Sequence, residues 1–279
     1  MSAVWDLGVH ELPDRAVVLQ VDQSASHEAA RTWAADQAAL EGRPLVLIGM
    51  APTGPGTAIT LPRARELSSS FVATAADVVR RTHPGLDVRS VVRTADSLPA
   101  LLDLSRRCAL LVIGSHPKGV TAVVKSWRAD ATVANRAECP VVVVPRHHPA
   151  RARHGVLVGV EVGAHDEVLE FAYRQASIRP VPLTVMTCER HGKNREDCRR
   201  GLAEATAGYG QLFPDVHVTL EQRQGRPAHD LVLAATAMNL LVVGRHRPTG
   251  ISNSLAGHVR TGVVDRSPCP VAVVPFSTS

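Results

Sequence analysis

The chain repeats itself, and this constrains its fold more than any other feature of the sequence. The segment LLVIGS at 110–115 returns as LLVVGR at 240–245. Likewise, CPVVVVP at 139–145 returns as CPVAVVP at 269–275, and both pairs lie 130 positions apart. Apolar segments that recur in the same order over this length indicate two copies of one domain.

The beginnings of the two copies also match. AVVLQVD at 16–22 corresponds to GVLVGVE at 155–161, and these lie 139 positions apart, so the second copy is shorter. At roughly 100–200 residues per domain, the length of the chain suits two domains. We predict a first domain at 1–146, a basic linker at 147–154, and a second domain at 155–279. The linker is interpreted as a solvated hinge, with a contact to nucleic acid or to an acidic partner as the alternative.

Short apolar segments alternate with amphipathic segments in each copy. Segments of strand type in the first copy lie at 16–22, 44–50, 86–93, 109–114 and 140–145. Pro99 and Pro227 suit the first turn of a helix at corresponding places in the two copies. Strands rich in Val and Leu that alternate with helices predict a parallel sheet covered on both faces. We therefore predict an α/β chain of two tandem doubly wound domains, each with a five-stranded parallel sheet.

Composition excludes several classes of protein. With 45% hydrophobic and 20% charged residues, the chain is neither disordered nor a mini-protein held together by disulfides. The net charge of +5 is small for this length, and aromatic residues make up only 3%. Nucleic-acid binding, which needs clustered positive charge or stacking rings, is therefore not expected.

The cysteines and the amino-terminal segment both point to the cytoplasm. The five cysteines are odd in number and include no CxxC pair, which favours free thiols in a reducing compartment. Cys139 and Cys269 recur at equivalent places, which favours a packing role. Asp6 and Glu11 stand where a signal peptide would be basic and then apolar. No apolar stretch approaches the roughly 20 residues that cross a bilayer. We expect a cytoplasmic protein with no membrane partner.

The residues that follow the first and fourth strands are the candidates for a binding site. Parallel sheets of this type bind ligands beyond the carboxyl ends of their strands, where the strand order reverses. In the first copy these residues are Asp22, Gly114 and Ser115, and in the second copy they are Glu161, Gly244 and Arg245.

These positions carry a resemblance to the universal stress protein family. A typical member has a first strand ending in V-D-G-S, a fourth strand ending in Gly, a G-x-x-G loop, nine residues, G-[ST], a helix, and a last strand opened by C-P-V. The resemblance covers nearly the whole chain and implies a strand order of 3-2-1-4-5. It also implies that the fifth strand pairs with another domain, which in a tandem member can be residues 141–144 with residues 271–274. A homodimer and an unidentified protein partner are compatible with it. Many members bind ATP.

The first copy keeps only part of the family's ATP motif. Asp22 matches the aspartate of the first strand, and Gly114 keeps the first glycine. Pro117 stands at the second glycine and removes a backbone N–H. Trp127 stands at the third glycine and fills the space that phosphate needs.

The second copy keeps more of that motif. Gly244 and Gly257 retain the first and third glycines, while Arg247 replaces the second and His258 replaces the Ser or Thr. Glu161 replaces the aspartate of the first strand. The side chains of Arg245, Arg247 and His258 are able to hold phosphate oxygens in place of the missing backbone groups. The resemblance therefore implies that ATP, if it binds, does so more readily here than in the first copy, and that the only metal is the Mg that accompanies it. In both copies, a degenerate loop that only packs the end of the sheet is the favoured interpretation.

Other patterns lack residues that their chemistry needs. The loop Gly49–Gly54 is followed by no Lys-Ser/Thr pair. Cys188 and Cys198 flank His191 without a further pair of zinc ligands. His27 follows no nucleophile elbow and is interpreted as a surface or capping residue. We predict no catalytic residue and a protein that acts by binding. A scaffold that binds no nucleotide and a slow ATPase are the alternatives.

Overall fold

The structure is a computed structural model in which the chain divides into two compact units, Met1–Arg146 and His147–Ser279. It describes residues 12–22, 27–51, 60–115, 131–146, 155–161, 166–189, 195–245 and 262–276. The predicted linker at 147–154 lies outside these described residues.

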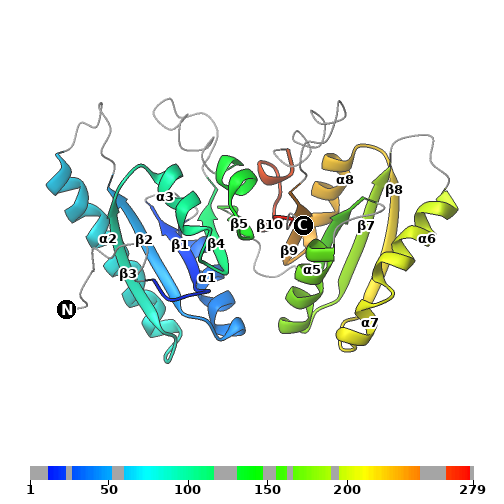
Figure 1. Ribbon diagram of the computed structural model, residues 1–279, viewed down its shortest axis with the longest axis horizontal. Coiled ribbons are helices and arrows are strands. Elements are labelled where there is room, and N and C mark those ends of the chain that lie inside the picture. The colour runs from blue at the N-terminus through cyan, green and yellow to red at the C-terminus, as the bar shows by residue number, and fades with distance from the viewer. Residues whose placement is uncertain are drawn as a thin grey trace. The chain divides into compact units, whose positions relative to one another are not determined.

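The first unit alternates strands and helices as the sequence pattern predicts (Figure 1). Its elements are β1 (Val17–Val21), α1 (His27–Glu41), β2 (Leu45–Ala51), α2 (Leu61–Thr82), β3 (Val88–Thr94), α3 (Ser97–Leu104), β4 (Leu110–Gly114) and β5 (Val141–Val144). Residues 131–136 are also helical. Each predicted strand is confirmed to within two residues at either end, and Pro99 lies in the first turn of α3.

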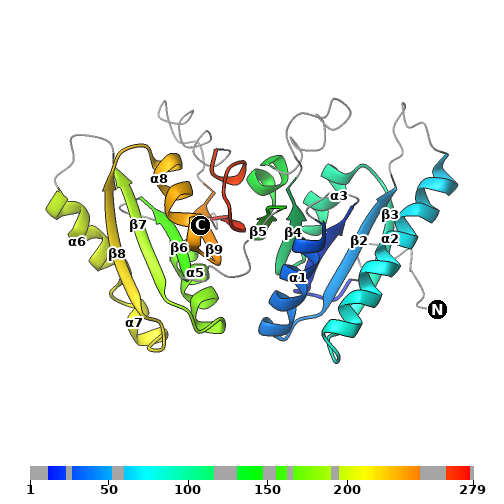
Figure 2. The same ribbon diagram turned by 180° about the vertical axis from the view of Figure 1, so that it is seen from behind.

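The sheet of the first unit has the order β3-β2-β1-β4-β5, which confirms the predicted fold class. Every pairing in it is parallel, with Leu19 beside Leu47 of β2 and Val112 of β4. The chain moves toward one edge through α1 and α2 and toward the other edge after β3. Right-handed crossovers therefore place α1 and α2 together on one face of the sheet. Figure 2 shows this face in front. His83 and Asp36 join these two helices through a 2.9 Å contact between Nε2 and Oδ1.

The second unit repeats this topology, with the order β8-β7-β6-β9-β10. Its elements are β6 (Val156–Val160), α5 (Asp166–Ile178), β7 (Leu183–Glu189), α6 (Arg195–Thr206), α7 (Tyr209–Leu212), β8 (Val218–Gln224), α8 (Pro227–Ala234), the 3-10 turn Ala235–Ala237, β9 (Leu240–Gly244) and β10 (Val271–Val274). Pro227 opens α8, as predicted.

The core of each unit is built around its central strands. Val17–Leu19, Leu110–Val112 and their counterparts in β6 and β9 are fully or almost fully buried, because helices cover both faces of the sheet. The outer strands differ. Most of β3 is buried beneath the long helix α2, whereas β8 packs against the shorter α6 and stays half-exposed. Stacked rings of Tyr173, Tyr209 and Phe213 attach α7 to α5.

Candidate functional site

The predicted site residues of the first unit lie at the ends of neighbouring strands. β1 and β4 pair directly, with Leu19 beside Val112. The same register continued by three residues brings Asp22 and Ser115 side by side at the carboxyl edge of the sheet. Gly114 is the last residue of β4, and the Ser115 N–H donates a 2.8 Å hydrogen bond to the Val144 carbonyl of β5. The structure therefore brings together all three residues predicted for this half.

His27, for which the sequence pattern favoured a surface or capping role, lies at this edge. It is the first residue of α1 and is half-buried, with its Nδ1 atom buried and without a hydrogen-bond partner. Burial is the largest effect on the imidazole and lowers its pKa. The Asp22 carboxylate opposes that shift, while Arg31 adds to it. Because burial outweighs the effect of the Asp22 carboxylate, the His27 imidazole is neutral at pH 7. The sequence did contain a signal for this placement, because His27 follows Asp22 by only five residues and begins the helix after the first strand.

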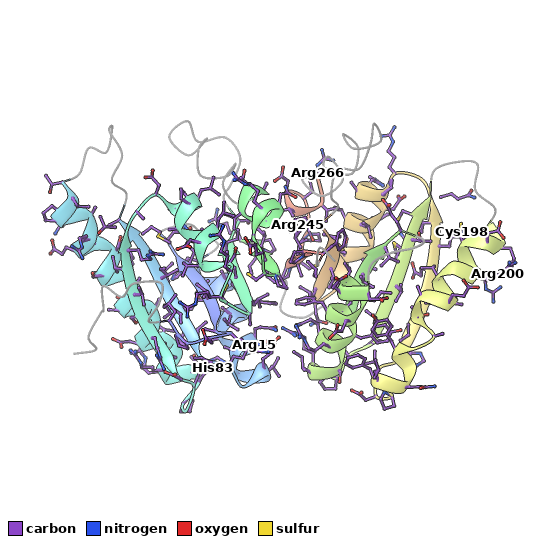
Figure 3. The ribbon with its side chains drawn as sticks, in the orientation of Figure 1. Arg15, His83, Cys198, Arg200, Arg245 and Arg266 are labelled. Carbon is purple, nitrogen blue, oxygen red and sulfur yellow. The ribbon has the colours of Figure 1, made fainter. Side chains whose placement is uncertain are left out.

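The second unit repeats the arrangement with different side chains. β6 pairs with β9, with Gly159 beside Val243, and the same register continued by two residues brings Glu161 next to Arg245. The Arg245 N–H donates a 2.7 Å hydrogen bond to the Val274 carbonyl, as Ser115 does in the first unit. Arg245, which is labelled in Figure 3, is half-buried, whereas Glu161 is exposed. The acidic and basic residues predicted for this half are therefore neighbours at the sheet edge.

The protein's own packing accounts for the glycine that ends β9. A Cβ atom on Gly244 would lie 2.8 Å from ring carbons of Phe276 and 3.0 Å from a methyl carbon of Val168 in α5. Both distances are shorter than a normal carbon–carbon contact. Gly244 is needed to admit the Phe276 ring, which is a packing role that the family's phosphate motif does not by itself require of this glycine.

Three predicted site residues are outside the described part of the chain: Arg247, Gly257 and His258. Pro117 and Trp127, which interrupt the loop in the first half, are outside it as well. The structure therefore locates the residues from which both loops start, and these residues occupy equivalent places in the two units.

The described residues show neither a metal site nor a membrane-spanning helix. Among the described residues, no group of three or more His, Cys, Asp or Glu side chains is arranged to hold a metal ion. Cys188 is half-buried, Cys198 is buried, and His191 between them is outside the described residues. No described helix combines the length and apolar character needed to span a membrane.

Two doubly wound units, each with an acidic residue beside the end of its fourth strand, define a tandem α/β protein with a candidate ligand site at each sheet edge. Comparison with known families makes this specific. The model of the universal stress protein family matches residues 15–145 and again residues 153–275. The chain belongs to the universal stress protein family, as a tandem two-domain member.

Individual relatives agree with this assignment. A universal stress protein of Mycolicibacterium smegmatis is 29% identical over 95% of this chain and 99% of its own length. One from Mycobacterium tuberculosis is 27% identical over 92% of this chain and 96% of its own length.

Solved structures show the same fold. A universal stress protein of Archaeoglobus fulgidus matches with a TM-score of 0.76 at 16% identity, over 94% of this chain and 96% of that one. A putative universal stress protein of Pseudomonas aeruginosa matches with a TM-score of 0.59 at 19% identity, over 94% of this chain and 93% of that one.

Proposed function

We propose that this universal stress protein is a cytoplasmic stress-response regulator that acts by binding, without catalytic turnover. Its ligand is an adenine nucleotide, ATP with its Mg, held at the carboxyl edge of the second unit. The observation that carries this proposal is the placement of Arg245 beside Glu161 at the point where the strand order reverses. Ligands of doubly wound sheets bind at this point.

The nucleotide's phosphates would be held by side chains. Phe276 and Val168 occupy the space next to Gly244, so phosphate cannot approach that α-carbon as it approaches a bare glycine turn. Arginine offers several N–H donors in a fixed geometry and forms paired hydrogen bonds with phosphate oxygens. Arg245, together with Arg247 and His258, supplies donors to the phosphates in place of the backbone N–H group of the replaced glycine.

A titration of the full chain with Mg-ATP by calorimetry tests the proposal. We expect one site per chain with a dissociation constant in the micromolar range. Arg245→Gln should weaken binding about tenfold or more, since a charge-assisted hydrogen bond contributes about 1.5–3 kcal/mol. Ser115→Gln, at the equivalent place in the first unit, is the matched control and should leave the affinity unchanged. Equal weakening by both variants would contradict a site in the second unit.

A scaffold that binds no nucleotide is the second candidate, and the Phe276 ring beside Gly244 favours it. In that case no heat of binding appears at millimolar ATP, and Gly244 serves packing alone. A slow ATPase is distinguished from both candidates by a phosphate-release assay. Only an ATPase continues to release phosphate after its site is saturated with ATP.

A further inference from the structure

Two cysteines from distant parts of the first unit lie in contact. The Sγ atoms of Cys108 and Cys139 are 3.4 Å apart, although the residues are 31 positions apart in the chain. Cys108 precedes β4 and is half-buried, while Cys139 precedes β5 and is only 6% exposed. Both lie at the amino ends of their strands, at the edge of the sheet opposite the candidate ligand site.

The backbone on both sides of this pair is tied in place. The Cys108 N–H donates to the Leu104 carbonyl at 3.1 Å, and the Leu111 N–H donates to the Pro140 carbonyl at 3.0 Å. A disulfide needs an S–S distance of about 2.05 Å, so the sulfurs have only about 1.4 Å to close. Side-chain rotation covers such a distance without moving the strands.

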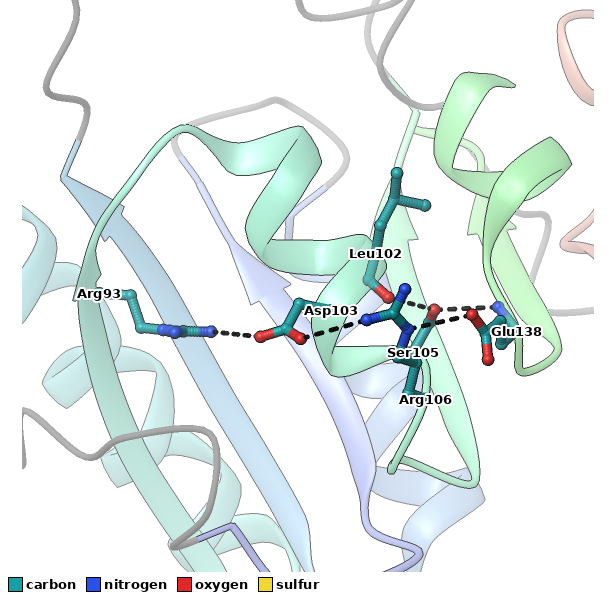
Figure 4. Close-up of polar contacts among 6 residues, drawn as sticks. All are labelled: Arg93, Leu102, Asp103, Ser105, Arg106 and Glu138. Carbon is teal, nitrogen blue, oxygen red and sulfur yellow. Dashed lines mark hydrogen bonds and ion pairs between the residues drawn. The ribbon is translucent and has the colours of Figure 1, made fainter.

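A polar cluster next to the cysteines connects the same two segments (Figure 4). The Glu138 N–H donates to Ser105 Oγ at 2.9 Å, and that hydroxyl donates to the Leu102 carbonyl at 2.6 Å. Arg106 Nε donates to Glu138 Oε1 at 3.0 Å, and Arg106 also lies 3.9 Å from Asp103. These contacts hold the turn after α3 against the segment that leads into β5, and so they fix the two thiols opposite each other.

The second unit lacks this arrangement. At the repeat spacing, Met238 stands in place of Cys108, Ala235 in place of Ser105, and Pro268 in place of Glu138. Cys269, the counterpart of Cys139, instead lies 3.6 Å from Ser267 Oγ. The thiol pair and its polar cluster are therefore features of the first unit and not general requirements of the fold.

We propose that Cys108 and Cys139 form a peroxide-reactive dithiol that closes to a disulfide. Cys108 is the attacking group because peroxide can reach it. Its sulfur attacks one oxygen of hydrogen peroxide, the S–O bond forms, the O–O bond breaks, and one water leaves after taking up a proton. Cys139 then attacks the sulfenic acid of Cys108, the S–S bond forms, the S–O bond breaks, and the proton of Cys139 leaves with the second water.

The environments of the two sulfurs suit these roles. The hydrogen bond with Cys108 and burial both raise the pKa of Cys139, so it is a protonated thiol in the reduced protein and leaves the first attack to Cys108. The disulfide would enclose β4 and the residues between it and Cys139, and it would constrain the unfolded chain over that length. We expect the oxidised first unit to unfold about 5 °C higher than the reduced one.

Peptide mapping tests the proposal on the full chain. Trypsin cleaves after Arg107 and Arg136, so Cys108 and Cys139 fall in the separate peptides 108–118 and 137–146. After hydrogen peroxide and blocking of free thiols, we expect these two peptides joined, two of the five thiols lost, and the unfolding temperature raised. Cys108→Ser should abolish all three effects. Cys188→Ser, the same change at a half-buried thiol of the second unit, should keep the linked peptide and the temperature shift.

Two results would overturn the proposal. One is a Cys108 peptide that carries sulfinic or sulfonic acid while Cys139 remains a free thiol. The other is a Cys108 disulfide to a second chain, seen as a covalent dimer without reductant. The linked peptide is detected in the wild-type protein after peroxide treatment, so the conclusion does not depend on how well a variant folds.

Discussion

At the scale of single residues, buried titratable side chains make the stability of the protein depend on pH. Burial lowers the pKa of His27 and raises that of Cys269, so each group favours its neutral form in the folded state. Because both groups titrate normally in the unfolded chain, the folded protein loses stability toward acid through the histidine and toward alkali through the cysteine.

The loss of folding stability in acid should depend on His27. Its folded pKa lies below the unfolded value of 6.5, so its contribution is complete above that pH and is lost as the pH falls below it. Urea unfolding between pH 7.5 and 5 should therefore show a smaller decline in His27→Gln than in the wild type. Asp22→Asn removes the charge that raises the pKa of His27, and it should make the decline steeper. Identical pH profiles for all three proteins would contradict this account.

Alkaline sensitivity should follow Cys269. Its pKa is raised from 9.0 to about 11, mainly by burial, so its contribution is complete below pH 9 and is lost between pH 9 and 11. A shift of two units corresponds to about 2–3 kcal/mol. Cys269→Ala should flatten the fall in unfolding free energy across this interval, whatever its effect at neutral pH. A slope equal to that of the wild type would show that another group is responsible.

At the scale of elements, the two copies begin their first strands differently. Ala16 precedes β1, whereas Gly155 precedes β6 with a φ of +121°. A Cβ atom on Gly155 would overlap the Pro182 carbonyl oxygen, which accepts the Val156 N–H in the adjacent ladder. The sheet therefore requires glycine at this position in the second unit alone.

Gly155→Ala should destabilise the second unit by about 3 kcal/mol or more, because positive φ and a backbone clash act together. Gly42→Ala is the matched control. Gly42 also has a positive φ, of 62°, but its missing Cβ would meet nothing within 4 Å. Gly42→Ala should lower the free energy of unfolding by only about 1 kcal/mol, which is the cost of a positive φ for alanine. Chemical denaturation of both variants measures the difference, and equal losses would exclude the clash as its cause.

At the scale of the whole molecule, each unit has an outer strand with backbone groups that need partners. The carbonyls of Pro140 and Val144 accept hydrogen bonds from β4, and successive residues direct their backbone groups to alternating sides. Val141 and Val143 therefore direct their N–H and C=O groups away from β4, and Val271 and Val273 do the same beyond β9. Unpaired apolar edges of this kind promote aggregation. We propose that β5 and β10 satisfy each other within the chain.

Val143→Pro tests this pairing, because it removes an outward N–H without touching the ladder to β4. We expect a loss of about 1–3 kcal/mol and self-association in analytical ultracentrifugation. Leu220→Pro is the control, since Leu220 lies in β8, which ends the strand order of the second unit, is 40% exposed and also directs its N–H outward. Proline is tolerated at such edge positions, so Leu220→Pro should cost clearly less. A smaller loss for Val143→Pro than for Leu220→Pro would argue against paired edges.

The sequence by itself determined the tandem α/β fold, the strands and the residues at the strand ends. Periodicity and repetition are local properties, and the carboxyl ends of parallel strands must meet at one edge. Only the tertiary structure decided which distant side chains touch. Phe276 beside Gly244, Cys108 against Cys139 and the burial of His27 depend on how separate segments pack, and no pattern along the chain encodes those contacts.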